Sequence, residues 1–114
     1  MVSGYTFRLY CLFRRHGRDI SLALEFFFTS GDFDDFCQWP FDREVVLRLA
    51  HPSDSSKTIH CPLPLSGPEA AAVFQKPGRS TSNPGFFTEE YCWDEIEAAG
   101  FVSDGILRVD VTFE

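Results

Sequence analysis

Two polar side chains near the start of the chain could bind a carboxylate. Arg8 and Tyr10 stand two residues apart in segment 5–13, where large apolar side chains occupy every second position. Side chains two apart on a β-strand point to the same face, so a guanidinium and a phenol would lie side by side. A guanidinium can donate paired hydrogen bonds to a carboxylate. The alternative interpretation is an ordinary solvated strand face.

Two adjacent aromatic residues form a second candidate binding feature. Phe86 and Phe87 follow a Pro84-Gly85 turn, and their rings could hold an apolar or aromatic side chain of a ligand. The alternative is packing in the core. Because successive side chains of an extended segment point to opposite faces, we expect one of the two rings to be buried.

The chain contains no recognisable catalytic motif. His16, His51 and His60 lie in turns or in a proline-rich segment, and none accompanies a nucleophile in a known pattern. A Cys–His dyad stays open, because its members meet in space rather than in sequence; structural, buried cysteines are the alternative. We therefore expect a protein that is not an enzyme and that uses no cofactor.

Two charged segments have ordinary explanations. Asp32, Asp34 and Asp35 resemble the start of a calcium-binding loop, but the glycine and the distal glutamate that such a loop requires are missing. We interpret them as a solvated acidic turn and expect no metal site. The basic residues at 14–18 either bind an anion or form the soluble tip of a hairpin.

Length, charge and cysteine content restrict the class of protein. The 114 residues suffice for one domain. The net charge of −7 argues against nucleic acid as the main partner, because phosphate binding needs clustered positive charge. The apolar runs are too short to span a membrane, and no charged-then-apolar pattern follows Met1, so we expect neither a membrane span nor a leader. Four cysteines without the paired spacing of a zinc site predict free thiols in the cytoplasm, with two disulfides in a secreted domain as the alternative: Cys11, Cys37, Cys61 and Cys92.

The hydrophobic pattern predicts an all-β fold, an antiparallel sandwich or barrel that positions these side chains. Alternating or β-branched runs separated by turns indicate strands, and we expect them at 5–13, 20–28, 44–50, 58–65, 85–91 and 106–113. Pro62 and Pro64 place the fourth of these at a sheet edge. The spacing from Ser66 to Glu69 predicts a capping box for a short helix ending near Phe74, and a second short helix is expected at 93–99. The aromatic loop 33–41 should cover the open end of the core.

The order of several short motifs resembles the C-terminal MATH domain of the TNF-receptor-associated factors (TRAF proteins). The similarity extends from about Arg8 to Phe113, and Trp39-Pro40-Phe41 is its most specific element. The other matching segments are Arg8-Leu9-Tyr10, Gly17-Arg18, Ser21-Leu22-Ala23-Leu24-Glu25-Phe26-Phe27-Phe28, Gly31-Asp32-Phe33-Asp34, Phe74-Gln75-Lys76-Pro77, Asn83-Pro84-Gly85-Phe86 and Phe101-Val102-Ser103-Asp104-Gly105-Ile106-Leu107.

The resemblance implies an antiparallel β-sandwich that works as an adaptor. Such domains hold short extended peptides from receptor tails or signalling proteins by β-augmentation, in ubiquitin-dependent TNF-receptor and Toll-type signalling. By this resemblance, Arg8 and Tyr10 match the family's peptide-contacting Arg and Tyr, and we predict that Gly85, Phe86 and Phe87 complete the peptide-binding site. The resemblance also implies a cytoplasmic domain and a weak homo-oligomer, a trimer in the family.

Several positions depart from the family pattern. Ala71, Ala72 and Val73 stand where relatives that read Gln-containing motifs have serines, so recognition of Pro-x-Glu-x-x-aromatic peptides fits better. Glu25 stands where the family often has Phe, and it would repel an acidic ligand. The two N-terminal strands of the family have no counterpart before Tyr5. We therefore interpret 1–114 as a single domain that is partial at its N-terminus, with unpaired edges on the strands at 7–13 and 106–113.

Three functional hypotheses follow from the sequence. The first is the peptide-binding adaptor. The second is a substrate-docking MATH module of a ubiquitin ligase or deubiquitinase, which reads Ser/Thr-rich motifs. The third is a degenerate oligomerisation or decoy domain that has lost peptide binding.

Overall fold

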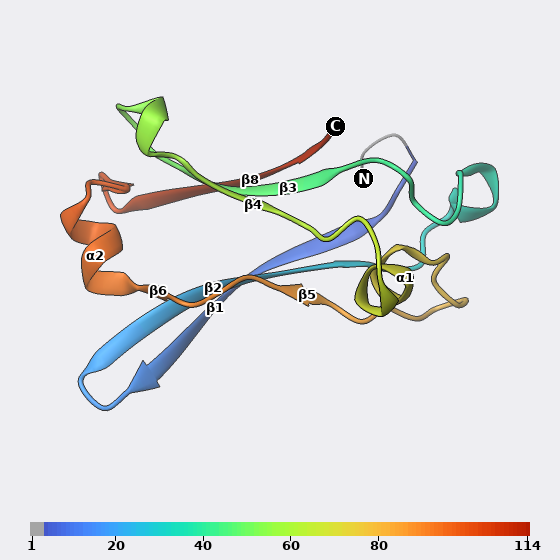
Figure 1. Cartoon of the computed structure of the whole chain (residues 1–114), viewed down its shortest axis with the longest axis horizontal. Helices are drawn as coiled ribbons and strands as arrows, with labels where there is room; N and C mark the ends of the chain where they lie inside the picture. Colours follow the sequence, from blue (N-terminus) through green and yellow to red (C-terminus); the bar gives the residue numbers. More distant parts are fainter. Residues whose placement is uncertain (1–3) are drawn as a thin grey trace.

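The computed structural model describes residues 4–114 and consists of two facing antiparallel sheets (Figure 1). One sheet contains β1 (Phe7–His16), β2 (Asp19–Phe28), β5 (Phe86–Phe87) and β6 (Tyr91–Cys92). The other has the order β4 (Ile59–Pro62), β3 (Val45–Ala50), β8 (Ile106–Phe113) and β7 (Val102–Ser103). The connections include α1 (Pro68–Phe74), α2 (Trp93–Ala98) and the 3-10 turns η1 (Asp34–Phe36) and η2 (Ser55–Lys57). The expected mostly-β, two-layer architecture is confirmed.

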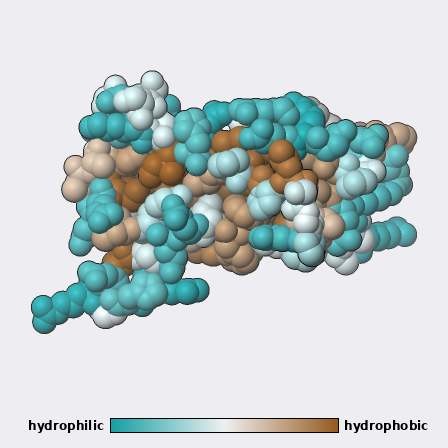
Figure 2. Space-filling view, viewed as in Figure 1, coloured by the Kyte–Doolittle hydropathy of each residue, from teal (hydrophilic) through white to brown (hydrophobic). Residues whose placement is uncertain are grey.

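The hairpin of β1 and β2 is the longest paired element. Its register runs from Phe7 opposite Phe28 to His16 opposite Asp19. The two-residue turn has Gly17 at a φ of 64°, which suits a type II′ turn whose twist matches that of the strands. The hairpin tip projects beyond the sandwich (Figure 1), and Figure 2 shows it as hydrophilic. The basic segment 14–18 therefore occupies an exposed tip.

The core lies between the two sheets. From Leu22 to Phe28, every second side chain of β2 is fully buried, and so is every second one of β3, as the alternation predicts. Phe28 is the centre of an aromatic cluster, with its ring centroid 5.0 Å from Phe41 and 5.6 Å from Trp39. The side chains with no exposure are Leu22, Leu24, Phe26, Phe28, Val45, Leu47 and Leu49. Burial of each such side chain contributes roughly 1.5–3 kcal/mol.

The aromatic loop 33–41 covers the core with only half of its rings. Trp39 packs edge-on against Tyr5 at 5.1 Å, and its indole Nε1 donates to the carbonyl of Asp34 at 2.8 Å. Phe41 is buried, whereas Phe33 and Phe36 point to solvent, Phe36 with 86% of its surface exposed. The expectation of a loop over the end of the core is correct for the Trp39-Pro40-Phe41 part alone.

Three local predictions need correction. The capping box is wrong, because α1 begins at Pro68 after Gly67, and Ser66 lies outside the helix with no capping bond. A proline suits the first helical position, where its missing N–H is not needed. Segment 85–91 is not one strand but the separate strands β5 and β6, and β7 was not expected. The edge position of β4, with Pro62 at its end, is confirmed.

The cysteines are less buried than expected. All four are free thiols, but Cys11 and Cys92 are exposed and only Cys61 is buried. Cys11 lies on the inward side of β1, where the two sheets diverge toward the hairpin tip (Figure 1). Among residues 4–114, β1 is the last strand of its sheet, and β8 beyond residue 107 has no neighbour on the side away from β3. The unpaired edges are therefore present, while the absence of two family strands stays a prediction.

Candidate functional site

The outward face of the β1–β2–β5 sheet carries the predicted site residues. The side chains of Phe7 and Leu9 pack against the core, so the alternate residues Arg8 and Tyr10 point outward. Both are exposed, and the guanidinium of Arg8 has no hydrogen bond or ion pair with any described residue. The Tyr10 ring lies edge-on to Phe27, with the centroids 5.4 Å apart. The predicted pairing of a guanidinium and a phenol on one strand face is therefore present.

The register places a third strand beside this pair. Tyr10 is opposite Glu25, and Glu25 is in turn opposite Phe87 on β5. These three side chains therefore form one row across the outward face. Phe87 is 56% exposed, whereas its neighbour Phe86 is opposite Phe26 and packs against the core. As expected for an extended segment, one ring of the pair points inward and the other outward.

Gly85 leaves room for the side chain of Glu25. A Cβ atom added at Gly85 would lie 2.5 Å from the Oε2 atom and 2.9 Å from the Cγ atom of Glu25. Ordinary van der Waals contact begins near 3.5 Å, so any larger residue would displace this carboxylate. Gly85 thus allows the Glu25 side chain to reach across from β2 over the start of β5.

The strand β5 is an open edge of the sheet. The amide of Thr88 donates to Leu24 at 2.9 Å, and the amide of Asn83 donates to Phe28 at 2.8 Å. Because hydrogen-bonding directions alternate along an antiparallel strand, the backbone groups of Phe87 point away from β2. No other described strand pairs with that side. The edge can accept a further extended segment.

A polar cluster fixes the segment that follows β5. Ser21 donates to the Oε1 atom of Glu90 at 2.7 Å, and the ring of His16 lies 3.2 Å from the same atom. These two hydrogen bonds lower the pKa of Glu90, with a smaller contribution from the charge of Arg14. Sequence reasoning missed this cluster, because Ser21 and Glu90 are 69 residues apart and neither belongs to a local motif.

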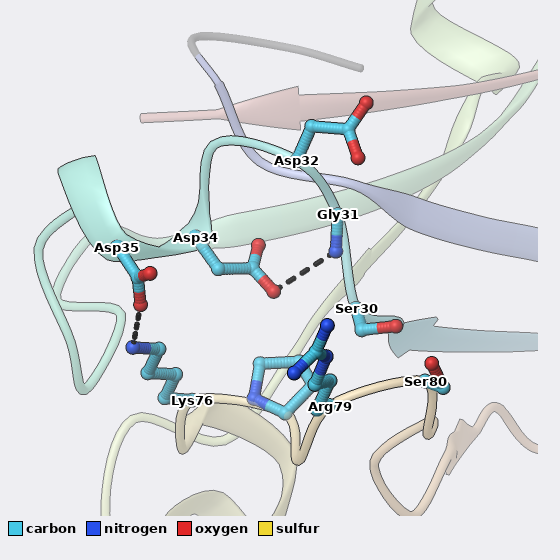
Figure 3. A pocket seen from close by; sticks show the side chains of 9 residues that line it. Ser30, Gly31, Asp32, Asp34, Asp35, Lys76, Arg79 and Ser80 are labelled. Atoms are coloured by element: carbon cyan, nitrogen blue, oxygen red, sulfur yellow. Dashed lines mark hydrogen bonds and ion pairs between the residues drawn. The ribbon is translucent and has the colours of Figure 1, made fainter.

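A cavity of about 520 Å³ lies away from this face, between the acidic turn and the loop after α1 (Figure 3). An ion pair between Lys76 and Asp35 joins its two sides, and the contact with Lys76 lowers the pKa of Asp35. The turn is only partly solvated, because Asp34 is buried and accepts from the amide of Gly31 at 2.9 Å. Within residues 4–114, no group of three acidic, histidine or cysteine side chains is placed to hold a metal ion.

Cys61 and His51 have partners other than each other. Cys61 lies 3.0 Å from the hydroxyl of Tyr91; burial and this contact raise the pKa of the phenol. The Nε2 atom of His51 is 2.8 Å from the carbonyl of Ala99, and its Nδ1 atom accepts from the amide of Asp54. The first contact joins β4 to β6, and the contact of His51 with Ala99 ties the loop after β3 to the end of α2.

Comparison with models of known protein families identifies one family that matches the sequence. A family model described as TRAF/meprin, MATH domain matches residues 2–110. No curated protein matches the chain. Of the helices within residues 4–114, none has the length and apolar character needed to cross a membrane.

Proposed function

The chain belongs to the TRAF/meprin MATH domain family, and from that premise we propose that it is an adaptor that holds short extended peptides of receptor tails or signalling proteins. MATH domains are non-catalytic protein-interaction modules, although they also occur within enzymes. We place this adaptor in ubiquitin-dependent TNF-receptor or Toll-type signalling in the cytoplasm. The four free thiols support a reducing compartment.

One observation carries the proposal: an exposed arginine whose side chain has no partner among residues 4–114 shares an outward sheet face with the open strand β5. Arg8 lies on this face together with the exposed rings of Tyr10 and Phe87. A peptide strand added at the β5 edge would receive main-chain hydrogen bonds from Phe87, and its side chains would reach the outward face. Such main-chain bonding supplies affinity, and side-chain pockets supply selectivity.

Arg8 is the residue to test first. A guanidinium that binds a peptide carboxylate contributes about 1.5–3 kcal/mol, so Arg8→Ala should weaken binding of Pro-x-Glu-x-x-aromatic peptides by roughly 10- to 150-fold. Arg18→Ala is the matched control, because Arg18 is also exposed and has no described partner but lies at the hairpin tip. The measurement is fluorescence polarisation with array-selected peptides. Equal losses in the two variants would contradict the proposal.

The same array separates the other hypotheses. Preference for Ser/Thr-rich peptides would support a substrate-docking module of a ubiquitin ligase or deubiquitinase. An array without any binding peptide would support a degenerate domain.

The open edge of β8 favours homo-oligomerisation as a second candidate function. Glu44 and Glu114 exchange backbone hydrogen bonds of 3.1 and 2.7 Å. The alternation of hydrogen-bond direction from this pair leaves the backbone groups of Val109, Val111 and Phe113 pointing to the free edge. A second copy can pair with these groups without displacing β7, which pairs with residues 106 and 107.

Charge selects one register for that pairing. An antiparallel pair centred on Val111 sets Arg108 opposite Glu114 of the second copy. A register centred on Asp110 would oppose two aspartates, which is unfavourable. We therefore propose a weak dimer through β8, in place of the trimer of the family. Analytical ultracentrifugation should show self-association that Arg108→Glu abolishes and Arg18→Glu leaves unchanged; a monomer at all concentrations would refute the dimer.

A further inference from the structure

The carboxylate of Glu25 has no partner in the described part of the chain, although its surroundings partly bury it. The Glu25 side chain makes no hydrogen bond or ion pair with any residue among 4–114. Other acidic side chains in the same structure do have partners: Glu90 is bonded by Ser21, and Asp35 pairs with Lys76. An acidic group in the middle of a sheet face, without a cation beside it, has an unused capacity to bind positive charge.

The immediate neighbours of Glu25 are two exposed rings. Tyr10 is opposite it on β1, and Phe87 is opposite it on β5. Side chains directly opposite in an antiparallel pair have Cβ atoms about 4.5–5.5 Å apart, so the Glu25 side chain starts between the two aromatic side chains, and its carboxylate extends from there over Gly85. Aromatic faces attract cations, most strongly where water is partly excluded. An alkylammonium or guanidinium group would meet a negative charge and two π-faces at once.

The position of the carboxylate relative to the open edge adds an independent argument. Glu25 belongs to the middle strand β2, but its Oε2 atom lies where a Cβ atom of Gly85 would be. The charge is therefore carried over the start of β5, the strand that borders the proposed peptide. A long basic side chain of that peptide can reach it.

We propose that Glu25, Tyr10 and Phe87 form a pocket for a lysine or arginine side chain of the bound peptide. This inference rests on the proposed peptide-binding function and specifies its ligand: an extended peptide with a basic residue over Glu25. An acidic residue placed there is rejected by like charge, so the acidic residue of the ligand binds at Arg8, which is diagonal to Glu25 in the register.

The test is a position scan. Each variable position of a Pro-x-Glu-x-x-aromatic peptide is replaced in turn by Lys, Gln or Glu, and affinities are measured by fluorescence polarisation. At one position, Lys should bind about tenfold more tightly than Gln, and Glu should bind more weakly still. Glu25→Gln should remove the preference for Lys over Gln, and Glu25→Lys should reverse it in favour of Glu. Glu69→Gln, the same chemical change on the exposed surface of α1, should leave the preference intact.

The outcomes separate this inference from the function on which it rests. Peptides that bind in an Arg8-dependent manner without any preference for Lys overturn the basic pocket and leave the adaptor function standing. An unchanged preference for Lys in Glu25→Gln, in a protein with the thermal unfolding curve of the wild type, overturns the assignment to Glu25. A chain that binds no peptide at all overturns both.

Discussion

The contact between Gly85 and Glu25 allows a sharp prediction about stability. In Gly85→Ala the new Cβ atom would lie 2.5 Å from Oε2 and 2.9 Å from Cγ of Glu25, about 1 Å closer than ordinary contact. Gly85 is not among the glycines of positive φ, so the backbone itself accepts alanine. The collision with one side chain is therefore the main cost of the change.

The magnitude follows from two opposing effects. Displacement of Glu25 into a strained rotamer costs about 0.5–1.5 kcal/mol. Replacement of glycine by alanine at a compatible backbone position stabilises by about 0.4–1 kcal/mol, through the entropy of the unfolded chain. The free energy of unfolding of Gly85→Ala should therefore stay within about 1 kcal/mol of the wild type. In a Glu25→Ala background the collision is absent, so the same change should be stabilising.

A double-mutant cycle measured by urea unfolding tests this reasoning. The four proteins are the wild type, the two single variants and the double variant, and the coupling energy should be about 0.5–1.5 kcal/mol. If Gly85→Ala has the same effect with and without the Glu25 side chain, the contact does not constrain position 85. If it costs more than about 2 kcal/mol in both backgrounds, the backbone conformation rather than Glu25 requires glycine.

Three further changes test the core and the two polar clusters. Phe28→Ala should lower the free energy of unfolding by about 3–5 kcal/mol, because Phe28 is fully buried among aromatic rings. Phe36→Ala should have little effect, since Phe36 is 86% exposed. Urea unfolding of the two variants measures the difference. Ser21→Ala should raise the pKa of Glu90, because the hydrogen bond from Ser21 is the largest cause of its lowering, and NMR titration of Glu90 measures it. The folded-state pKa of Glu90 is below its unfolded value, so the stabilisation from ionised Glu90 is present above the unfolded pKa and is lost as pH falls through the folded pKa. A stability–pH profile that is as steep in Ser21→Ala as in the wild type would contradict this. Lys76→Met should raise the pKa of Asp35 toward its ordinary value, as followed by NMR, while Lys57→Met, a control on the surface turn η2, should not.

The sequence predicts the faces of the long strands better than their partners. Alternation identified the buried side of β2 and the outward side of β1, because one face of each strand is covered by the core. To predict which of Phe86 and Phe87 points outward, one needs the register that pairs them with Phe26 and Glu25. No local pattern contains that register, so the sequence predicted that one ring is buried without predicting which.

The errors arise where side chains form hydrogen bonds that the hydrophobic pattern does not indicate. Segment 85–91 reads as one strand, but the hydroxyl of Thr88 accepts from the amide of Leu24, and Glu90 is held by Ser21. These bonds interrupt the ladder between β5 and β6. The burial of Asp34 was also missed, because its oxygen satisfies the amide of Gly31 inside a turn that has the composition of a solvated loop. Local composition cannot report such pairings, since their stability comes from the folded context.

The way in which β1 is anchored determines which part of its outward face can act as a preformed site. Phe7 is 5.4 Å from Phe26 and 5.5 Å from Phe113, measured between ring centroids, so the first half of the strand is held by the core. Phe13, near the far end, is 57% exposed and packs edge-on against Trp93. Arg8 and Tyr10 belong to the anchored half. Ligand binding by Arg8 and Tyr10 therefore costs less conformational entropy than ligand binding by side chains at the hairpin tip. This difference favours Arg8 and Tyr10 as the recognition element over the more numerous basic residues at 14–18.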